Sequence, residues 1–330
     1  MKFTIIILYF FAFSFCNAQI KIPDYEKFKS ERIILKNDTI NFHVFSPEKI
    51  RETTGIILYI HGSGPFPMYN VKKENKSSWI NSTVPFDLNG IPKDYILVLV
   101  SKKCVPFLVL NEEYKVKKCF YENESLDYRV WQNNIVINHI IKTTVKMPKK
   151  VIAIGHSEGS DVVAKLGTKN SKLTHIGFWS GSGNSQYNDF AFMIRNEANT
   201  GKITEKESIQ KLDSLFVQLE EIENNPNSVE KQWQENSYRR WKQFSEPSVE
   251  NLLKINIPIF VAMGTKDESV PVESSLIIKT EFIRKNKKNL TYRLYPNYDH
   301  GLDLISEDPL KEPEEKWMEV FKEFMEWTNK

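Results

Sequence analysis

A serine flanked by glycines is the first candidate for chemistry in this chain. Ser157 lies in Gly155–Gly159, which reads G-H-S-E-G, directly after the apolar run Val151–Ile154 and before the helix-compatible residues 160–164. Strand, sharp turn and helix form the context in which a G-x-S-x-G serine acts as a nucleophile. The glycines suit this role because such a serine has a strained backbone and its neighbours must lack bulky side chains. A glycine-flanked turn without a chemical role is the alternative.

A serine hydroxyl needs a general base to become nucleophilic, and that base needs an orienting acid. Asp267 follows the apolar run Ile257–Ala262, and His300 follows the alternating run Leu290–Leu294. The carboxyl ends of parallel strands meet at one edge of a sheet, so these distant residues can converge there. We therefore predict a triad of Ser157, His300 and Asp267.

Two other carboxylates compete for the orienting position. Asp299 is adjacent to His300, and Glu268 follows Asp267. Sequence neighbours rarely present their side chains to one another well, which favours Asp267 over Asp299.

A glycine-rich loop supplies the remaining component. Residues His61–Pro65 read H-G-S-G-P and follow the apolar run Gly55–Ile60. An oxyanion hole takes one backbone N–H from the residue after the nucleophile, here Glu158, and one from a loop of this kind. Ser63 is the predicted second donor, and Gly64 is the alternative. Neither G-x-G-x-x-G nor a Walker lysine is present, which argues against a nucleotide phosphate.

The elements that must position these residues alternate along the chain. The sequence predicts two antiparallel edge strands, buried parallel strands and intervening helices, hence an α/β fold with a mainly parallel sheet covered on both faces. The expected strands are residues 32–35, 39–45, 55–60, 95–100, 151–154, 176–179, 257–262 and 290–294, and the expected helices are residues 126–145, 161–166, 273–283 and 314–327.

A long connection interrupts this alternation. Between Gly183 and Ile257, Thr204–Glu207 predicts a capping box that opens an amphipathic helix, and Ser228–Phe244 predicts a second helix. The segment 184–254 is interpreted as a helical cap over the active site; a helix pair on the flank of the domain is the alternative. Three aromatic residues of the second helix could shape an acyl pocket or serve as core: Trp233, Tyr238 and Trp241.

These motifs together resemble the α/β-hydrolase superfamily over about residues 30 to 329. The elbow, the loop Asp267–Pro271 and the helical insert are similar to secreted bacterial esterases of the cinnamoyl-esterase and dienelactone-hydrolase-like kind, and to prolyl-oligopeptidase-like catalytic domains. The resemblance implies an eight-stranded sheet and a serine hydrolase without a cofactor. The hydrolase core would comprise residues 19–183 and 255–330. The loop Lys102–Val105 departs from the Asp-x-Arg-Gly-type turn of many relatives.

Composition narrows the possible partners. The chain has 330 residues, 41% hydrophobic and 26% charged, which is ordinary for a globular protein. A net charge of +3 with scattered charges marks no nucleic-acid surface. No H-E-x-x-H or comparable spacing indicates a metal site. The expected partner is a small ester or short peptide substrate.

The amino-terminal residues predict export. An apolar run, Phe3–Phe15, precedes Cys16–Gln19, which suits signal peptidase cleavage after Ala18. The run is shorter than the roughly 20 residues needed to span a membrane, so we expect residues 1–18 to be a signal peptide and the protein to be secreted or periplasmic. Cys104 and Cys119 then remain as a possible disulfide, with two unpaired thiols as the alternative.

The predicted function is hydrolysis of carboxylic esters through an acyl-enzyme. A secreted peptidase or an acyl thioesterase is the nearest alternative, and a non-catalytic binding protein on the same fold is the third. An aminopeptidase would need carboxylates that grip the substrate amine. Within the helical insert, Glu220 and Glu221 are the only obvious adjacent pair, and a solvated helix face is the favoured explanation for them.

Overall fold

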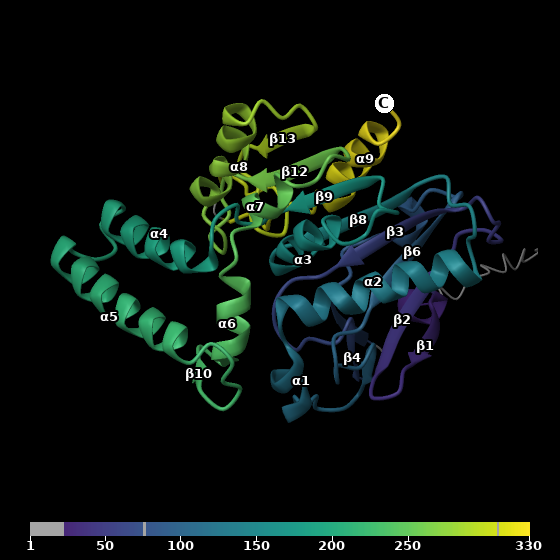
Figure 1. Cartoon of the computed structure of the whole chain (residues 1–330), viewed down its shortest axis with the longest axis horizontal. Coiled ribbons are helices and arrows are strands. Elements are labelled where there is room, and N and C mark those ends of the chain that lie inside the picture. Colours follow the sequence, from purple (N-terminus) through teal and green to yellow (C-terminus); the bar gives the residue numbers. More distant parts are fainter. Residues whose placement is uncertain (1–22, 75–76, 309) are drawn as a thin grey trace, which may run out of the picture.

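An eight-stranded sheet forms the centre of the molecule (Figure 1). The computed structural model describes residues 23–74, 77–308 and 310–330, so the predicted signal peptide lies outside the described residues. Within this sheet, the pairs β1–β2 and β2–β6 are antiparallel and the other five are parallel, which confirms the predicted mainly parallel α/β sheet. In spatial order the strands are β1 (Lys29–Ile34), β2 (Thr39–Phe45), β6 (Tyr95–Val100), β3 (Gly55–Ile60), β8 (Val151–His156), β9 (His175–Trp179), β12 (Ile259–Gly264) and β13 (Leu290–Tyr295).

Alternate residues of the parallel strands face two separate hydrophobic cores. In β3, Ile56 and Leu58 belong to one core, whereas Ile57 and Tyr59 belong to the other. Continuous apolar runs therefore form these strands because both faces of the sheet are covered. The first core is closed by α2 (Leu126–Thr143), α3 (Glu158–Gly167), α7 (Ser248–Leu252) and α8 (Val272–Arg284), and the second by α9 (Trp317–Trp327).

Three of the four predicted helices occur close to their expected bounds, as α2, α3 and α8. The last helix begins at Trp317, three residues after the expected Glu314. The reason is that Glu314 pairs with Leu304 in an isolated antiparallel bridge, with backbone N···O distances of 2.8 and 3.0 Å.

The connection between β9 and β12 is helical but differs in detail from the prediction. It contains α4 (Gln186–Asn199), α5 (Glu205–Asn224) and α6 (Tyr238–Phe244), and α4 packs beside α5 (Figure 1). Thr204 and Glu207 form both bonds of the predicted capping box. The prediction of one helix over Ser228–Phe244 is wrong, because β10 (Gln232–Trp233) and β11 (Asn236–Ser237) form a hairpin whose turn residues Gln234 and Glu235 have positive φ.

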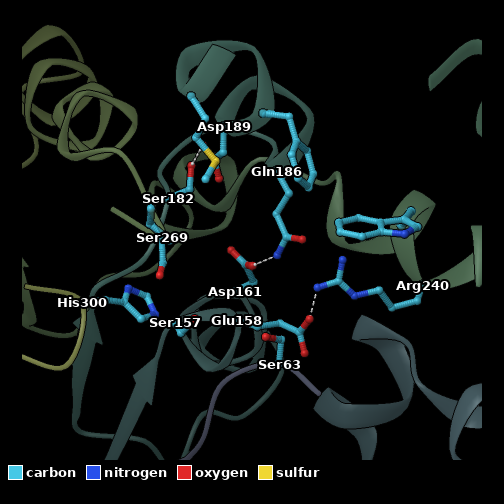
Figure 2. Close-up of a pocket in the computed structure, with 14 residues that line it drawn as sticks. Ser63, Ser157, Glu158, Asp161, Ser182, Gln186, Asp189, Arg240, Ser269 and His300 are labelled. Atoms are coloured by element: carbon cyan, nitrogen blue, oxygen red, sulfur yellow. Dashed lines mark hydrogen bonds and ion pairs between the residues drawn. The ribbon is translucent and has the colours of Figure 1, made fainter. Parts of the chain in front are cut away.

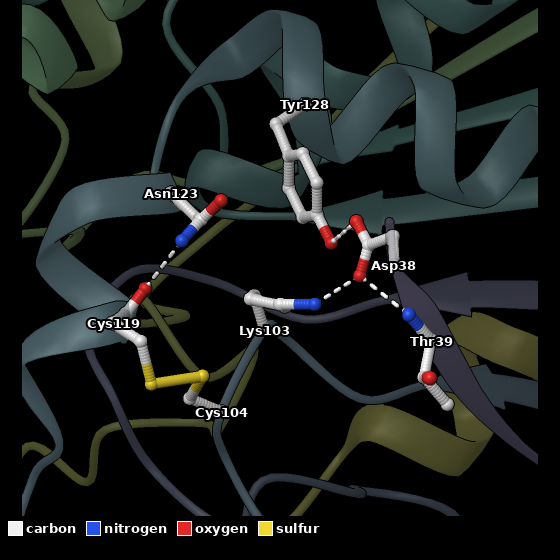
Figure 3. The surroundings of a disulfide bond; sticks show 7 residues. All are labelled: Asp38, Thr39, Lys103, Cys104, Cys119, Asn123 and Tyr128. Atoms are coloured by element: carbon white, nitrogen blue, oxygen red, sulfur yellow. Dashed lines mark hydrogen bonds and ion pairs between the residues drawn. A yellow bond between two sulfur atoms is a disulfide. The ribbon is translucent and has the colours of Figure 1, made fainter. Parts of the chain in front are cut away.

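A disulfide ties the loop after β6 to the rest of the domain (Figure 3). Cys104 is bonded to Cys119 in α1 (Lys118–Asn123), with a Cα–Cα distance of 6.1 Å. Next to it, Asp38 accepts hydrogen bonds from Lys103 and, at 2.8 Å, from the hydroxyl of Tyr128. The loop that the disulfide closes contains β7 (Leu108–Leu110), an edge strand of a three-stranded sheet with β4 (Tyr69–Glu74) and β5 (Ser77–Ser82) that the sequence analysis did not predict.

None of the helices in the described ranges is both long and apolar enough to span a membrane.

Candidate active site

The predicted nucleophile lies in a strained turn between β8 and α3. Ser157 has φ 55° and ψ −129°, and α3 begins at the next residue. A Cβ atom on Gly155 would lie 2.0 Å from the carbonyl oxygen of Gly159, and one on Gly159 would lie 2.0 Å from that of Ile60. Both positions therefore require glycine, because strand, turn and helix pack without room for a side chain.

The predicted base and acid are joined by a hydrogen bond. His300 Nδ1 lies 2.8 and 3.0 Å from the two carboxylate oxygens of Asp267. Asp267 is held in turn by the backbone N–H groups of Ser269 and Val270, which donate to Oδ1 at 2.9 and 2.8 Å. A carboxylate only accepts here, so Nδ1 carries the proton and Nε2 is left as the basic nitrogen. Figure 2 shows the imidazole beside Ser157.

The two alternative acids do not take this position. Asp299 Oδ1 accepts a hydrogen bond from the backbone N–H of Asp303 at 2.9 Å, within its own turn. Glu268 is exposed.

A second histidine supports the loop that carries the base. His156 Nε2 donates to the carbonyl oxygen of His300 at 2.7 Å, and its ring packs against Trp317 at a centroid distance of 5.2 Å. Burial lowers the pKa of His156 to about 3, so it stays neutral and keeps this donor role. Gly264, at the end of β12, completes the support, since a Cβ there would lie 2.3 Å from the Tyr298 carbonyl oxygen.

Two buried cations fix the predicted oxyanion loop. Lys102 Nζ donates to the carbonyl oxygens of Gly62 and Gly64 at 2.7 and 2.8 Å. Arg129 Nη2 donates to the carbonyl oxygen of His61 at 2.6 Å. A Cβ on Gly62 would lie 3.0 Å from the Cβ of Ser157, so the loop packs directly on the serine. The orientation of its peptide groups is thereby set before any substrate binds.

The same cations surround the side chain of Glu158. Arg129 bonds its carboxylate at 2.7 Å, Arg240 of α6 bonds it from the other side, and Lys102 lies 3.8 Å away. Burial alone would raise the pKa of Glu158, but the charges of these three cations hold it well below its usual range. Glu124 completes the group, with Oε1 3.5 Å from Lys102 Nζ. We call these five residues the Glu158 cluster.

One cavity is lined both by the predicted site residues and by helices of the connection between β9 and β12 (Figure 2). It has a volume of about 360 Å³, and Ser157, His300, Ser63 and Glu158 all line it. Asp267 lies behind His300, with no exposed side-chain surface. The other wall comes from α4 and α6 and includes Phe190, Met193, Arg240 and Trp241. Gly64, the alternative oxyanion donor, does not line the cavity.

Two carboxyl groups on the wall were not predicted from the sequence. Asp161 accepts hydrogen bonds from Ser248 at 2.5 Å and from Gln186 at 2.9 Å, and Asp189 accepts one from Ser182 at 2.8 Å. Burial raises the pKa of Asp161 to about 7 and that of Asp189 to about 6. Near neutral pH this side of the cavity is therefore only partly ionised.

Most of the other residues singled out from the sequence lie away from this cavity. Glu221 pairs with Lys231 on the exposed side of α5, at 3.0 Å, and Glu220 is not among the cavity residues. Of the three aromatic residues, Trp241 lines the cavity. Tyr238 packs in a small core, and the Trp233 carbonyl oxygen accepts a hydrogen bond from the Trp241 indole at 2.7 Å. Among the described residues, no three His, Cys, Asp or Glu side chains are grouped to hold a metal ion.

Comparison with known proteins agrees with this architecture. Residues 207–328 match the prolyl oligopeptidase family. The acylaminoacyl peptidase of Pyrococcus horikoshii superposes with a TM-score of 0.57 at 13% identity, over 92% of this chain and 41% of that one. Est1E from Butyrivibrio proteoclasticus superposes with a TM-score of 0.51 at 15% identity, over 91% of this chain and 98% of that one.

A puromycin-hydrolyzing peptidase of Mycobacterium tuberculosis also superposes, with a TM-score of 0.52 at 15% identity, over 86% of this chain and 38% of that one. The chain thus spans less than half the length of the two peptidases. No curated protein matches the sequence. The chain has an α/β-hydrolase fold, which it shares with these solved structures, and its residues 207–328 match the prolyl oligopeptidase family.

Proposed function

We propose that this protein is a serine hydrolase that cleaves carboxylic esters, with Ser157, His300 and Asp267 as its triad. The observation that carries the proposal is the bond from His300 Nδ1 to Asp267 beside a serine held at φ 55°. Ser63 and Glu158, the proposed oxyanion donors, line the same cavity. Nucleophile, base, orienting acid and backbone donors are the parts that acyl transfer requires.

The proposed reaction has two halves. His300 Nε2 takes the proton of Ser157 Oγ as this oxygen attacks the ester carbonyl, and the backbone N–H groups of Ser63 and Glu158 bind the oxyanion. Collapse of the tetrahedral intermediate breaks the bond to the alcohol, which leaves with the proton from His300. Water then attacks the acyl-enzyme, His300 takes its proton, and the acid is released with regeneration of Ser157.

Asp267 fixes the imidazole and stabilises its charged form during both halves. Because Lys102 and Arg129 hold the carbonyl oxygens of residues 61, 62 and 64, the loop that carries the Ser63 N–H needs no rearrangement when the oxyanion forms. The apolar side chains of Phe190, Met193 and Trp241 offer contact area to the substrate.

One observation favours a peptidase as the second candidate. Asp161 and Asp189 lie on the cavity wall, and the carboxyl group of either could pair with the amine of an aminoacyl substrate. The structural similarity to the acylaminoacyl peptidase is consistent with this second candidate. The structural similarity to Est1E is consistent with ester hydrolysis. Turnover of aminoacyl p-nitroanilides at a rate above that of simple esters would select the peptidase. An acyl thioesterase would use the same machinery on a thiol leaving group.

We also propose that the protein acts after export, in the periplasm or outside the cell. Support comes from the signal-like residues 1–18 and from the Cys104–Cys119 disulfide, since such bonds persist in oxidising compartments. Its expected partner is a small ester or short peptide, with no nucleic acid, no cofactor and no lasting membrane insertion.

The experiment that tests the function compares the mature protein with Ser157→Ala. Hydrolysis of p-nitrophenyl acetate, butyrate and octanoate, and of a methyl hydroxycinnamate, is measured for both. Serine-dependent turnover supports an esterase, and the chain-length profile reports on the cavity. A fluorophosphonate probe that labels the wild type but not the variant supports an activated serine. If the probe labels neither protein, a non-catalytic binding protein on this fold is the better explanation.

A further inference from the structure

The Glu158 cluster contains more positive than negative charge. Its cations are Lys102, Arg129 and Arg240, and its carboxylates are Glu124 and Glu158. Each of the five side chains is at most 5% exposed, so water does little to screen them. Burial raises the pKa of Glu124 and lowers that of Lys102 to about 8, so these two charges weaken together and the two guanidinium groups still exceed the single carboxylate of Glu158. A buried excess of positive charge calls for an anion.

Two of the three cations are fully used by the protein. Lys102 donates to two backbone carbonyl oxygens and lies near Glu124, and Arg129 donates to Glu158 and to His61. Arg240 differs. Its Nη2 bonds Glu158, but its Nε and Nη1 atoms are buried and find no hydrogen-bond partner within the described part of the protein.

Two aromatic rings hold the guanidinium of Arg240 in place, and they make no hydrogen bond to its Nε and Nη1 atoms. Its central carbon lies 4.0 Å from the ring centroid of Trp241 and 4.8 Å from that of Phe244, and these π-faces stabilise the charge. The side chain lines the cavity of Ser157, and Figure 2 shows one of its nitrogens directed to Glu158. Buried donors without partners are costly, which points to a ligand that supplies acceptors.

We propose that Arg240 binds a carboxylate of the substrate, so that the esters cleaved are half-esters of dicarboxylic acids. The planar fork of a guanidinium matches carboxylate oxygens, whereas an alcohol or an alkyl chain would leave its donors unused. The inference rests on the proposed ester hydrolysis and names its substrate class.

The carboxylate belongs to the acyl part of the substrate. His300 must deliver a proton to the leaving alcohol, so the alcohol lies next to His300 when the bond breaks. In Figure 2, Arg240 and His300 lie at opposite ends of the cavity, with Ser157 nearer His300. An acyl chain attached to Ser157 can therefore extend away from His300, toward Arg240.

The test compares two esters that differ in one charge. p-Nitrophenyl hemiglutarate carries a free carboxylate at the end of its acyl chain, and the p-nitrophenyl ester of monomethyl glutarate carries a methyl ester there. We expect the wild type to prefer the anionic ester by at least about tenfold in kcat/KM. In Arg240→Gln the ratio of the two kcat/KM values should fall to about one, mainly through a higher KM for the anionic ester; any effect of the lost Glu158 contact acts on both esters and leaves this ratio unchanged.

Lys242→Gln is the matched control. It removes one positive charge from the same helix, but Lys242 is 42% exposed and pairs with Glu223 rather than lining the cavity. We expect it to keep the preference. If Lys242→Gln loses the preference as fully as Arg240→Gln does, the effect is a general one of surface charge, and the inference is overturned.

The wild type alone decides the matter if Arg240→Gln does not fold. Monomethyl glutarate, a monocarboxylate, should slow fluorophosphonate labelling of Ser157 at concentrations where dimethyl glutarate does not. Equal protection by both compounds, or equal turnover of both p-nitrophenyl esters, overturns this inference and leaves the proposed esterase standing. Turnover of neither ester, without labelling of Ser157, overturns the proposed function and this inference with it.

Discussion

Lys102 Nζ lies 2.7 Å from the carbonyl oxygen of Gly62, so a cation from the loop after β6 holds the loop after β3. The same nitrogen bonds Gly64, at 2.8 Å. In the sequence, Lys102 is notable only as a departure from the turn that many α/β-hydrolases carry at this point. In the fold, its charge fixes the peptide groups next to the proposed nucleophile.

We predict that Lys102→Met lowers kcat by about 100-fold, because the peptide group of Ser63, the proposed second oxyanion donor, is no longer held in place. Lys103→Met is the control, since Lys103 bonds Asp38 and does not touch the loop. Steady-state hydrolysis of p-nitrophenyl butyrate measures both, and cooperative thermal unfolding checks that each variant is folded. A folded Lys102→Met protein with the kcat of the wild type would contradict the role given to this lysine.

Gly155→Ala should prevent the elbow from forming. A Cβ at this position meets backbone atoms 2.0 and 2.4 Å away, which cannot move as the end of a flexible side chain can. We expect a loss of at least about 3 kcal/mol in the free energy of unfolding. Gly201→Ala provides the comparison: Gly201 has φ +75° and no atom within 4 Å of the added Cβ, so it reports backbone strain alone, about 1 kcal/mol. If urea denaturation gives the same loss of unfolding free energy for both variants, the surrounding backbone accommodates the added Cβ at Gly155 at little energetic cost.

The sheet and the elbow could be predicted from the sequence because their signals are local. Continuous apolar runs, such as β3 and β6, are buried along their whole length. The G-x-S-x-G pattern places its serine between β8 and α3 by itself. That Ser157, Asp267 and His300 come together could be predicted from a general property of parallel sheets, because the carboxyl ends of parallel strands lie at the same edge of the sheet.

The residues that tune the cavity carry no such local signal. Arg240 reaches Glu158 across 82 positions of sequence, and Ser248 reaches Asp161 across 87. The residues next to Arg239 and Arg240 in the sequence do not show which of the two arginines reaches the cavity. The guanidinium of Arg239 donates to the backbone of Glu122 instead. The hairpin β10–β11 could not be predicted either. Its turn residues Gln234 and Glu235 have positive φ, whereas glycine or asparagine is the usual sequence signal for such a turn.

The Cys104–Cys119 disulfide should contribute to stability by closing a loop with a sequence separation of 15. The chain-entropy estimate for a loop of this length is about 3 kcal/mol. We expect the paired Cys104→Ser and Cys119→Ser substitutions to lower the unfolding free energy by about this amount. Dithiothreitol should lower the thermal midpoint of the wild type and leave that of the double variant unchanged. A midpoint insensitive to reductant in both proteins would mean that the bond adds no stability.

Asp161 should make the stability of the protein depend on pH. Burial raises the pKa of its carboxyl group from 3.8 to about 7 in the folded state, whereas the unfolded chain keeps the ordinary value. Between these two pH values the folded state binds more protons at Asp161 than the unfolded state does, so the contribution of this group to stability is fully present below about pH 4 and is lost as the pH rises through 7.

Asp161→Asn removes this titration. The substitution has a fixed cost, since Ser248 and Gln186 must share one acceptor oxygen, but that cost does not vary with pH. The unfolding free energy of the variant, relative to that of the wild type, should therefore rise by up to about 4 kcal/mol from pH 4 to pH 8. Urea denaturation at both pH values measures this change. The exposed Asp213 of α5 gives the control, because Asp213→Asn should follow the wild type at every pH. Parallel curves for Asp161→Asn and the wild type would mean that Asp161 is ionised in the folded protein at neutral pH, and the cavity would then present a full negative charge opposite Arg240.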